Sequence, residues 1–222
     1  METLASRAGC TAEAKLRAGC DALIVVDVQN DFLPGGVLAV PGAGGVIEPI
    51  NRYIRQFERL QLPVFATRDW HPREHCSFHE RGGPWPSHCV AGTHGARFPP
   101  QLELPPDVRL ISKATQPEAD AYSGFQGTDL AQQLRDLGCK RVFVAGLATE
   151  YCVRATVLDA RAAGLEVVVL ADAIGALNAK SGDGEHALAE MKAAGAQILP
   201  AGPVSGAEVL ATHAARNPTR AL

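Results

Sequence analysis

The chain has 222 residues, 20% of them charged, and a formal net charge of -3. This length is sufficient for one domain with a full hydrophobic core, and the balanced charge argues against nucleic acid or an anionic membrane surface as a partner. No apolar run reaches the roughly 18 residues of a membrane span, no secretory signal is recognisable, and the six cysteines are irregularly spaced, so we expect a cytoplasmic protein with reduced thiols.

Six short segments rich in β-branched and apolar residues predict strands, at 21–26, 63–67, 108–112, 141–145, 166–171 and 196–199. Most of them lack the alternation of polar and apolar residues that a strand with one solvated face shows. Continuous apolar strands of this kind are typical of a parallel sheet that is covered on both faces.

Four segments between these strands have helical periodicity, at 45–60, 129–137, 151–163 and 184–194. The last three are each followed by a glycine of the kind that ends helices. The alternation of strand and helix predicts a doubly wound α/β fold, with a mainly parallel six-stranded sheet and helices on both faces.

Residues 69–106 interrupt this rhythm, because they show neither helical nor strand periodicity. The segment holds five of the seven histidines, and structureless segments of this length inside a compact domain are usually functional. We therefore expect one domain, residues 21–200, with a functional insertion at 69–106 and with terminal tails at 1–20 and 201–222.

An aspartate ends the first apolar strand, in the stretch VVDVQNDF. In open parallel sheets, ligands bind beyond the carboxyl ends of the strands, so Asp27 lies where a substrate is expected. A partly desolvated carboxylate at this place can act as a general base. Asp31, four residues later, is expected to bond to backbone groups of the turn.

Asp69 and His71 follow the second predicted strand and are separated by one residue. Residues two apart in extended chain point to the same side, so a carboxylate and an imidazole project together as metal ligands. A third ligand would come from one of the other histidines of the insertion, His75, His79, His88 or His94. Such a set suits zinc, iron or manganese, and surface histidines in a polar loop are the alternative.

A buried strand leads into the stretch GLATEYCVRA, which predicts a tight turn and then a helix with Cys152 in its first turn. The N–H groups and the dipole at a helix N-terminus favour a thiolate and would lower the pKa of this cysteine. The same N–H groups can bind an oxyanion. We interpret Cys152 as a nucleophile, with a buried apolar filler as the alternative.

Lys113 ends the third predicted strand, at the same edge of the sheet as Asp27 and Cys152. A lysine at the tips of buried strands needs a counter-charge, which Asp27 can supply, and a surface lysine with a solvated head is the alternative. A carboxylate base, a cation and a thiol together form the nucleophilic triad that acyl transfer requires. The metal site predicted at Asp69 and His71 would lie beside it.

Five motifs occur in an order that is known from one family: ALIVVDVQNDFLPGGVLAVPGA, RDWHPREHCSF, WPSHCVAGTHGA, SKATQPEADAYSGF and VAGLATEYCVRATVLDA. Over about residues 21–200 the chain resembles the nicotinamidases (pyrazinamidases) of the isochorismatase-like cysteine hydrolases. The resemblance implies an isochorismatase-like three-layer fold. It also implies the hydrolysis of nicotinamide to nicotinate and ammonia in NAD salvage, with action on pyrazinamide-like amides.

The resemblance also implies the catalytic residues. Asp27, Lys113 and Cys152 match the family's triad, and the N–H groups of Ala148 and Cys152 match its oxyanion donors. The Leu147–Ala148 bond matches a position where the family has a cis peptide. Glu150 departs from the pattern, because the family often has aspartate there.

The remaining residues that the resemblance identifies would bind the substrate ring and the metal. Phe32, Trp85 and Tyr122 match the walls of the ring pocket. Asp69, His71 and His88 match the ligands of one divalent metal ion per chain, with zinc preferred over iron or manganese. His75 stays open as a fourth ligand.

Other functions remain alternatives at this point. One is an isochorismatase-like hydrolase that acts on another small amide or cleaves a vinyl ether, and another is a non-catalytic metal-binding relative. A redox protein is disfavoured, because no Cys-x-x-Cys pair exists. The expected partner is a small-molecule substrate, with neither nucleic acid nor membrane, and a homo-oligomer is left open.

Overall fold

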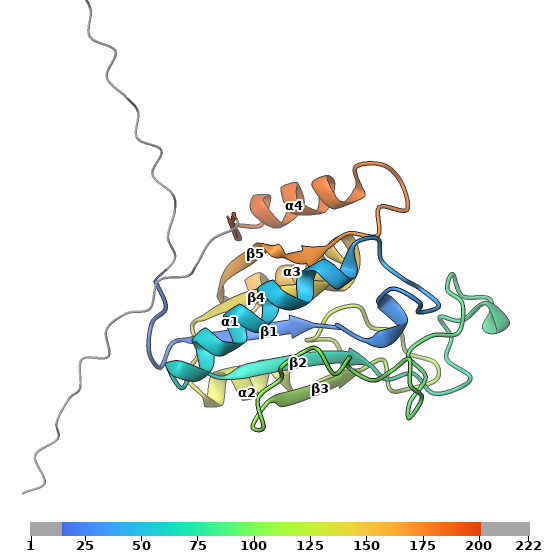
Figure 1. Ribbon diagram of the computed structural model, residues 1–222, viewed down its shortest axis with the longest axis horizontal. Coiled ribbons are helices and arrows are strands. Elements are labelled where there is room, and N and C mark those ends of the chain that lie inside the picture. The colour runs from blue at the N-terminus through green and yellow to red at the C-terminus, as the bar shows by residue number, and fades with distance from the viewer. Residues whose placement is uncertain (1–14, 201–222) are drawn as a thin grey trace, which may run out of the picture.

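The computed structural model describes residues 15–200. Its centre is a six-stranded sheet with the strand order β3-β2-β1-β4-β5-β6, in which every neighbouring pair is parallel (Figure 1). The strands are β1 (Asp21–Val26), β2 (Val64–Asp69), β3 (Arg109–Lys113), β4 (Arg141–Leu147), β5 (Glu166–Gly175) and β6 (Gln197–Leu199). The predicted doubly wound α/β fold is confirmed, and the sheet is parallel throughout.

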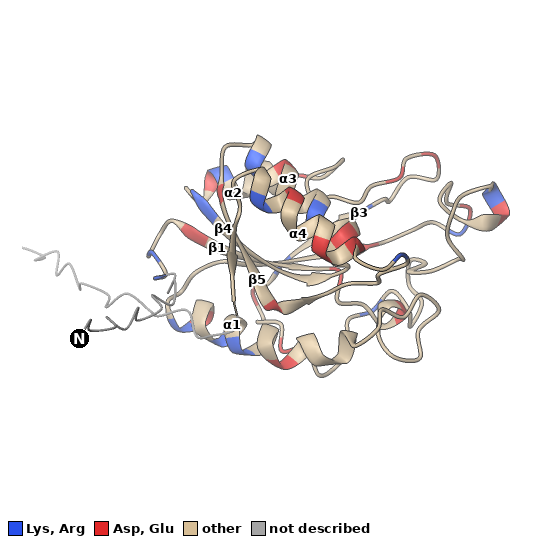
Figure 2. Cartoon of the chain, turned by 90° about the horizontal axis from the view of Figure 1, so that it is seen from above, with Lys and Arg blue, Asp and Glu red and all other residues tan. Residues whose placement is uncertain are grey.

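Helices cover both faces of the sheet, as Figure 2 shows. They are α1 (Ile47–Arg59), α2 (Leu130–Asp136), α3 (Arg154–Ala162) and α4 (Asp183–Ala193), each inside or within one residue of a predicted segment. The first covers one face, and the other three cover the opposite face. Among residues 15–200, none of the helices has the length and apolar character needed to cross a bilayer.

The first strand shows why the sheet is stable. All six residues of β1 are buried, and successive side chains point to opposite faces. Leu23 and Val25 join the core under α1, whereas Ile24 and Val26 join the core under α2, α3 and α4. Full burial of one such side chain contributes about 1.5–3 kcal/mol, so both layers of helices depend on this apolar strand.

The helix that covers the first face alone is strongly amphipathic. Ile50, Tyr53, Ile54 and Phe57 of α1 have no exposed surface. Their spacing of three and four residues places them on one side of the helix, which packs on the sheet. This face therefore has the bulkier core, and the opposite face uses smaller residues from three helices.

Several strands extend further toward their carboxyl ends than the apolar pattern predicts. The ladder between β2 and β3 continues to the pair Asp69 and Lys113, so these two residues are strand residues rather than loop residues. β5 continues to Gly175, beyond a shift of its register against β4. Asp172, in this extension, bonds to Arg52 and Tyr53 of α1.

Apart from Asp69, which ends β2, the insertion at residues 69–106 contains no strand or α-helix, as predicted. It has one short 3-10 helix, η3 (His79–Arg81), and two isolated bridges, His71 to Val90 and Phe78 to Trp85. The long loops, including this one, gather at the carboxyl ends of the strands (Figure 1). The insertion therefore lies where a parallel sheet places its ligands.

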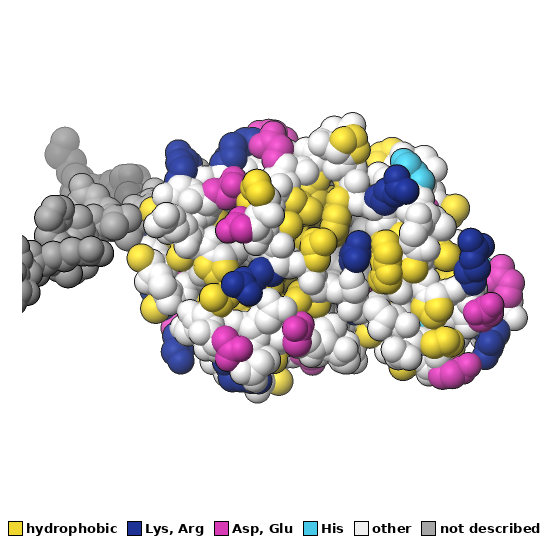
Figure 3. All heavy atoms as spheres, turned by 90° about the horizontal axis from the view of Figure 1, so that it is seen from below, with side chains coloured by type: hydrophobic (Ala, Val, Ile, Leu, Met, Phe, Trp, Pro, Cys, Tyr) yellow, Lys and Arg dark blue, Asp and Glu magenta, His cyan; other side chains and the backbone are white. Residues whose placement is uncertain are grey.

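The chain is already packed before the predicted domain start at residue 21. Leu16 is buried, and the Arg141 guanidinium donates to the Lys15 carbonyl and to the Asp21 carboxylate. Of the tails expected at 1–20 and 201–222, residues 1–14 and 201–222 lie outside the described residues. Over the described part, charged side chains of both signs are scattered, with exposed hydrophobic ones between them on the face shown in Figure 3.

Candidate active site

The strand order reverses direction between β1 and β4, and this creates a crevice at their carboxyl ends. Asp27 follows β1, and Cys152 follows β4 in the one-turn π-helix η4 (Thr149–Val153). The two strands approach closely at Val26 and Gly146. Gly146 has a φ of +117°, and a Cβ there would lie 2.0 Å from the Val26 carbonyl oxygen, so this approach requires glycine.

Asp27 is fully buried and has a positive φ of 48°. Its Oδ1 accepts a hydrogen bond from the Thr67 hydroxyl at 2.6 Å, and its Oδ2 lies 3.0 Å from the Lys113 ammonium. Burial raises the pKa of Asp27 above its usual range, although Lys113 opposes the shift. A carboxylate with a raised pKa is a stronger base than one in water.

Lys113 is the buried cation at the centre of the site. Its Nζ lies 2.5 Å from Asp69 Oδ1 and 3.4 Å from Cys152 Sγ, and it donates to the Ala121 carbonyl. Burial alone would lower the pKa of Lys113, but the carboxylates of Asp27 and Asp69 outweigh it and raise the pKa well above its usual value. The ammonium therefore stays charged, and it is not a solvated surface lysine.

Cys152 is buried, and its sulfur lies within 4.8 Å of a carboxylate oxygen of Asp27. The expectation of a lowered pKa at a helix N-terminus is wrong. Burial raises the pKa of Cys152 well above its ordinary value, and Lys113 only partly opposes the effect. The resting thiol is thus protonated, and its proton faces a carboxylate that can accept it.

The peptide bond between Leu147 and Ala148 is cis, as the resemblance implied. It joins the end of β4 to the turn that carries Cys152. Ala148 lines the same pocket as Cys152.

Asp69, His71 and His88 form a group whose ligand atoms all lie within 4.8 Å of one another. All three are buried, and neither ring nitrogen of His71 has a hydrogen-bond partner. Burial lowers the pKa of His71 to about 4, so its imidazole is neutral at pH 7. His88 Nδ1 donates to the Pro86 carbonyl at 2.8 Å, which leaves Nε2 with a free lone pair.

This donor set fits a divalent metal ion. Neutral imidazoles and one carboxylate are the ligands that zinc takes in catalytic sites. Two unpartnered, buried ring nitrogens would be costly without a ligand. Asp69 also bonds to Lys113, so the metal group and the triad share one network, a link that the sequence did not reveal.

The other three histidines of the insertion do not belong to this group. His75 uses both ring nitrogens, one with the Ser77 hydroxyl and one with the Ala119 carbonyl. His79 bonds to the Pro84 carbonyl, and His94 lies beside Asn30. His75 packs against the His71 ring, with 4.2 Å between ring centroids, so it supports a ligand without offering a free nitrogen.

Two side chains of the loop that follows β1 bond to the backbone of the segments that carry Asp69 and His88. The Gln29 amide accepts from the Asp69 N–H and donates to the Asp69 carbonyl, both at 2.8 Å. The Asp31 carboxylate accepts from the N–H of Cys89, the residue after His88, at 2.7 Å. Asp31 bonds to backbone as expected, but to the insertion rather than to its own turn. The role of Gln29 was missed.

A narrow, mainly apolar pocket opens onto Cys152. Phe32, Trp85 and Tyr122 all line it, and the Trp85 indole N–H donates to the Tyr122 hydroxyl at 2.9 Å. Sequence reasoning missed four further lining residues, Leu38, Val40, Tyr151 and Leu177. Of these, only Tyr151 had a signal, since it directly precedes Cys152.

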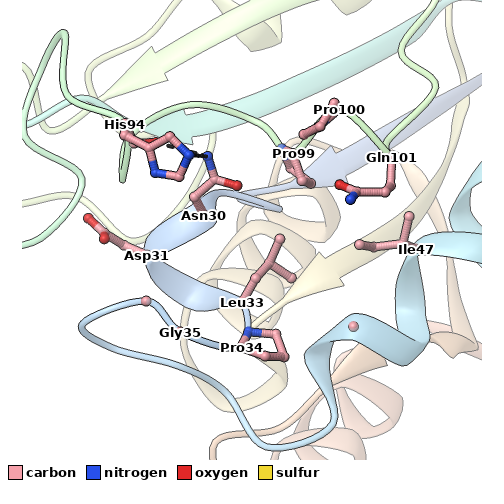
Figure 4. Close-up of a pocket in the computed structure, with 12 residues that line it drawn as sticks. Asn30, Asp31, Leu33, Pro34, Gly35, Ile47, His94, Pro99, Pro100 and Gln101 are labelled. Atoms are coloured by element: carbon pink, nitrogen blue, oxygen red, sulfur yellow. Dashed lines mark hydrogen bonds between the residues drawn. The ribbon is translucent and has the colours of Figure 1, made fainter.

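A second, more open hollow of about 550 Å³ lies beside the loop that follows β1 (Figure 4). It is lined by Asn30, Asp31, Leu33 and His94, together with segment 99–101 and the start of α1. None of the triad or the metal group lines it. The chemistry therefore belongs to the narrow pocket at Cys152.

Residues 21–202 match the family model described as "Isochorismatase domain". The chain belongs to the isochorismatase family. This member is 38% identical over 198 residues to the nicotinamidase of Escherichia coli, and the match covers 80% of the chain and 93% of that enzyme.

Solved structures support the same family. The pyrazinamidase of Pyrococcus horikoshii, solved in complex with zinc, is 55% identical, with a TM-score of 0.78, and the match covers 82% of this isochorismatase-family chain and 99% of that one. PnC1 from L. infantum, solved in complex with nicotinate, is 38% identical, with a TM-score of 0.77, and the match covers 84% of this chain and 96% of that one.

Proposed function

We propose that the chain is a metal-dependent cysteine amidohydrolase that converts nicotinamide to nicotinate and ammonia and also acts on pyrazinamide. The activity is that of the relatives it matches over nearly their whole length. The observation that supports the mechanism is the contact of Lys113 with Asp27, Asp69 and Cys152 in one buried crevice. This contact joins a base, a nucleophile and a metal group.

The first half of the reaction forms a thioester. Nicotinamide enters the narrow pocket with its flat ring between Phe32, Trp85 and Tyr122. Asp27 accepts the thiol proton, and the Cys152 sulfur attacks the carboxamide carbon. The thiol pKa is raised by burial, so proton transfer accompanies the attack rather than preceding it.

The developing oxyanion is held by the N–H groups of Ala148 and Cys152. One such donor is typically worth about 3 kcal/mol in the transition state. The proton on Asp27 then passes to the departing amino group, the carbon–nitrogen bond breaks, and ammonia leaves. Lys113 holds the Asp27 side chain in place and balances its charge while it is a carboxylate.

The second half hydrolyses the thioester. Asp27, now a carboxylate again, accepts a proton from water, and the water oxygen attacks the thioester carbonyl. The carbon–sulfur bond breaks, nicotinate forms, and the proton returns to the Cys152 sulfur. The same residues thus serve both halves, and no other acid or base is needed.

Asp69, His71 and His88 would hold one divalent ion, with zinc as our choice because the 55% identical Pyrococcus horikoshii structure contains it. When bound, the ion supplies a Lewis-acid site for the substrate's ring nitrogen. Gln29 fixes the Asp69 backbone, and Pro86 fixes the His88 ring. These contacts keep the ligand set in place.

The setting that we propose is cytoplasmic, with the small-molecule substrate as partner and no nucleic acid or membrane. All five cysteines within residues 15–200 are free thiols, which suits a reducing compartment.

The function is tested by measuring ammonia and nicotinate after nicotinamide is added to the purified protein. We expect equal amounts of both products, with loss of activity on metal chelation and recovery when zinc is returned. Pyrazinamide should also be hydrolysed. Absence of product from zinc-replete protein, together with turnover of another small amide, would contradict the substrate assignment.

A further inference from the structure

Glu150 is a buried carboxylate that the mechanism does not use. It lies in η4, two residues before Cys152, and has 7% of its surface exposed. Within the described residues no ion pair involves it. A buried carboxylate without a cationic partner needs hydrogen-bond donors, and the identity of those donors shows what it holds.

Both carboxylate oxygens bind the backbone of one loop. Oε2 accepts from the Leu177 N–H at 3.2 Å, and Oε1 accepts from the Asn178 N–H at 2.5 Å. These residues belong to segment 176–182, which connects β5 to α4. Asn178 has a positive φ of 51°, and its side chain accepts from the Gly184 N–H, so the loop turns sharply just beyond the two bonds.

The loop presents one side chain to the substrate pocket. Leu177 lines that pocket together with Ala148, Tyr151 and Cys152, and it packs on the core under α1. From Asn178 to Ser181 the loop is exposed. Through its two bonds, Glu150 thus connects the turn that carries Cys152 to the loop that supplies Leu177 to the wall of the substrate pocket.

We propose that Glu150 is a positioning residue that sets the width of the substrate pocket by holding Leu177 against the Cys152 turn. The inference rests on the proposed function. Glu150 touches neither the substrate nor the reacting atoms. It determines how closely the ring of an aromatic amide is enclosed, and therefore which ring substituents are accepted.

The test compares Glu150→Asp with the wild type on nicotinamide and on 5-methylnicotinamide. The shorter side chain removes about one carbon–carbon bond length of reach, roughly 1.5 Å, so one or both bonds are lost and Leu177 moves outward. Loss of a hydrogen bond to a charged acceptor should raise KM for nicotinamide about tenfold, with a much smaller change in kcat. The preference for nicotinamide over the methylated amide should fall about tenfold.

Two further variants make the result specific. Leu177→Ala should lower the preference for nicotinamide over the methylated amide by widening the pocket directly. The double variant Leu177→Ala/Glu150→Asp should have nearly the same preference as Leu177→Ala, since both changes act on one wall of the pocket. Glu58→Asp, the same change at an exposed position of α1, is the matched control and should leave both substrates unaffected. Glu150→Gln keeps the length and replaces Glu150→Asp if that protein does not fold.

The outcomes separate this inference from the proposed function. No ammonia from wild-type protein contradicts the proposed function itself. With an active wild type, Glu150 variants that match Glu58→Asp in KM and preference overturn the inference. So does an equal loss of kcat on both substrates with unchanged KM, because a merely structural role would produce it.

Discussion

Replacement of Lys113 by methionine should destabilise the protein far more than a lysine substitution ordinarily does. Lys113 Nζ lies 3.0 Å from Asp27 and 2.5 Å from Asp69, with 1% of the residue exposed. At an effective dielectric constant of about 20, these distances correspond to attractions of about 5.5 and 6.6 kcal/mol. Desolvation of the buried ions offsets much of this, and breaking such a network by removing one partner costs about 3–5 kcal/mol.

The assay is thermal unfolding of chelator-treated protein. A loss of about 3–5 kcal/mol in a chain of this size lowers Tm by roughly 6–20 °C. Lys192→Met, at an exposed position of α4, is the matched control and should shift Tm by no more than about 2 °C. Metal should reduce the loss in the Lys113 variant, since an ion at Asp69 replaces part of the missing positive charge.

The stability difference between Lys113→Met and the wild type should depend on pH. Without Lys113 the folded-state pKa of Asp27, which burial already raises, rises further, and the folded-state pKa of Asp69 rises above its unfolded value of about 4. The variant therefore gains stability relative to wild type as pH falls from 8 to 5 and the carboxyls take up protons. Adding Asp27→Asn should recover at least half of the lost stability. A Lys113→Met protein within 1 °C of wild type at pH 8, or a difference that widens at pH 5, would refute this reasoning.

Three more outcomes are expected. Asp27→Asn should lower kcat about 1,000-fold with little change in KM, because it removes the only general base of the mechanism; kcat within tenfold of wild type would contradict this. His71→Ala should reduce the metal content, measured by atomic emission, from about one ion per chain to below a tenth, and near-full occupancy would exclude His71 as a ligand. Burial, followed by the bond to Asp172, raises the pKa of Tyr53 to about 12. The stability that the protonated phenol contributes is therefore complete below pH 10 and is lost as pH rises through 12. In denaturant unfolding, the wild type should lose about 1.4 kcal/mol of stability relative to Tyr53→Phe by pH 11, and an equal dependence of stability on pH in the two proteins would contradict this.

The positions of the groups that we propose as catalytic followed from sequence because each is a polar residue next to an apolar strand. Asp27 after β1 and Lys113 at the end of β3 interrupt an apolar sequence pattern. Parallel strands bring such polar residues together at the carboxyl edge of the sheet. The cis bond before Ala148 came only from the family resemblance. Nothing in local sequence distinguishes that bond from a trans one.

What the sequence mispredicted or missed is the surroundings of these side chains in the fold. The turn at Cys152 was predicted, but its burial beside Asp27 depends on the whole sheet, and that burial reverses the sign of the pKa shift. The bond between Lys113 and Asp69 depends on the register of β2 and β3. Leu177 looks like an ordinary apolar loop residue in the sequence, and its place in the pocket wall depends on the folded path of its loop, which bonds to Glu150.

The central claim is that the Cys152 sulfur attacks the amide carbon, and rapid-quench mass spectrometry tests it most directly. Protein is mixed with excess nicotinamide, quenched in acid within the first turnover, and digested. The account predicts one nicotinoyl group on the peptide that carries Cys152, and neither adduct nor turnover in Cys152→Ala. A nicotinoyl group on another residue, or turnover by Cys152→Ala at the wild-type rate, would contradict it.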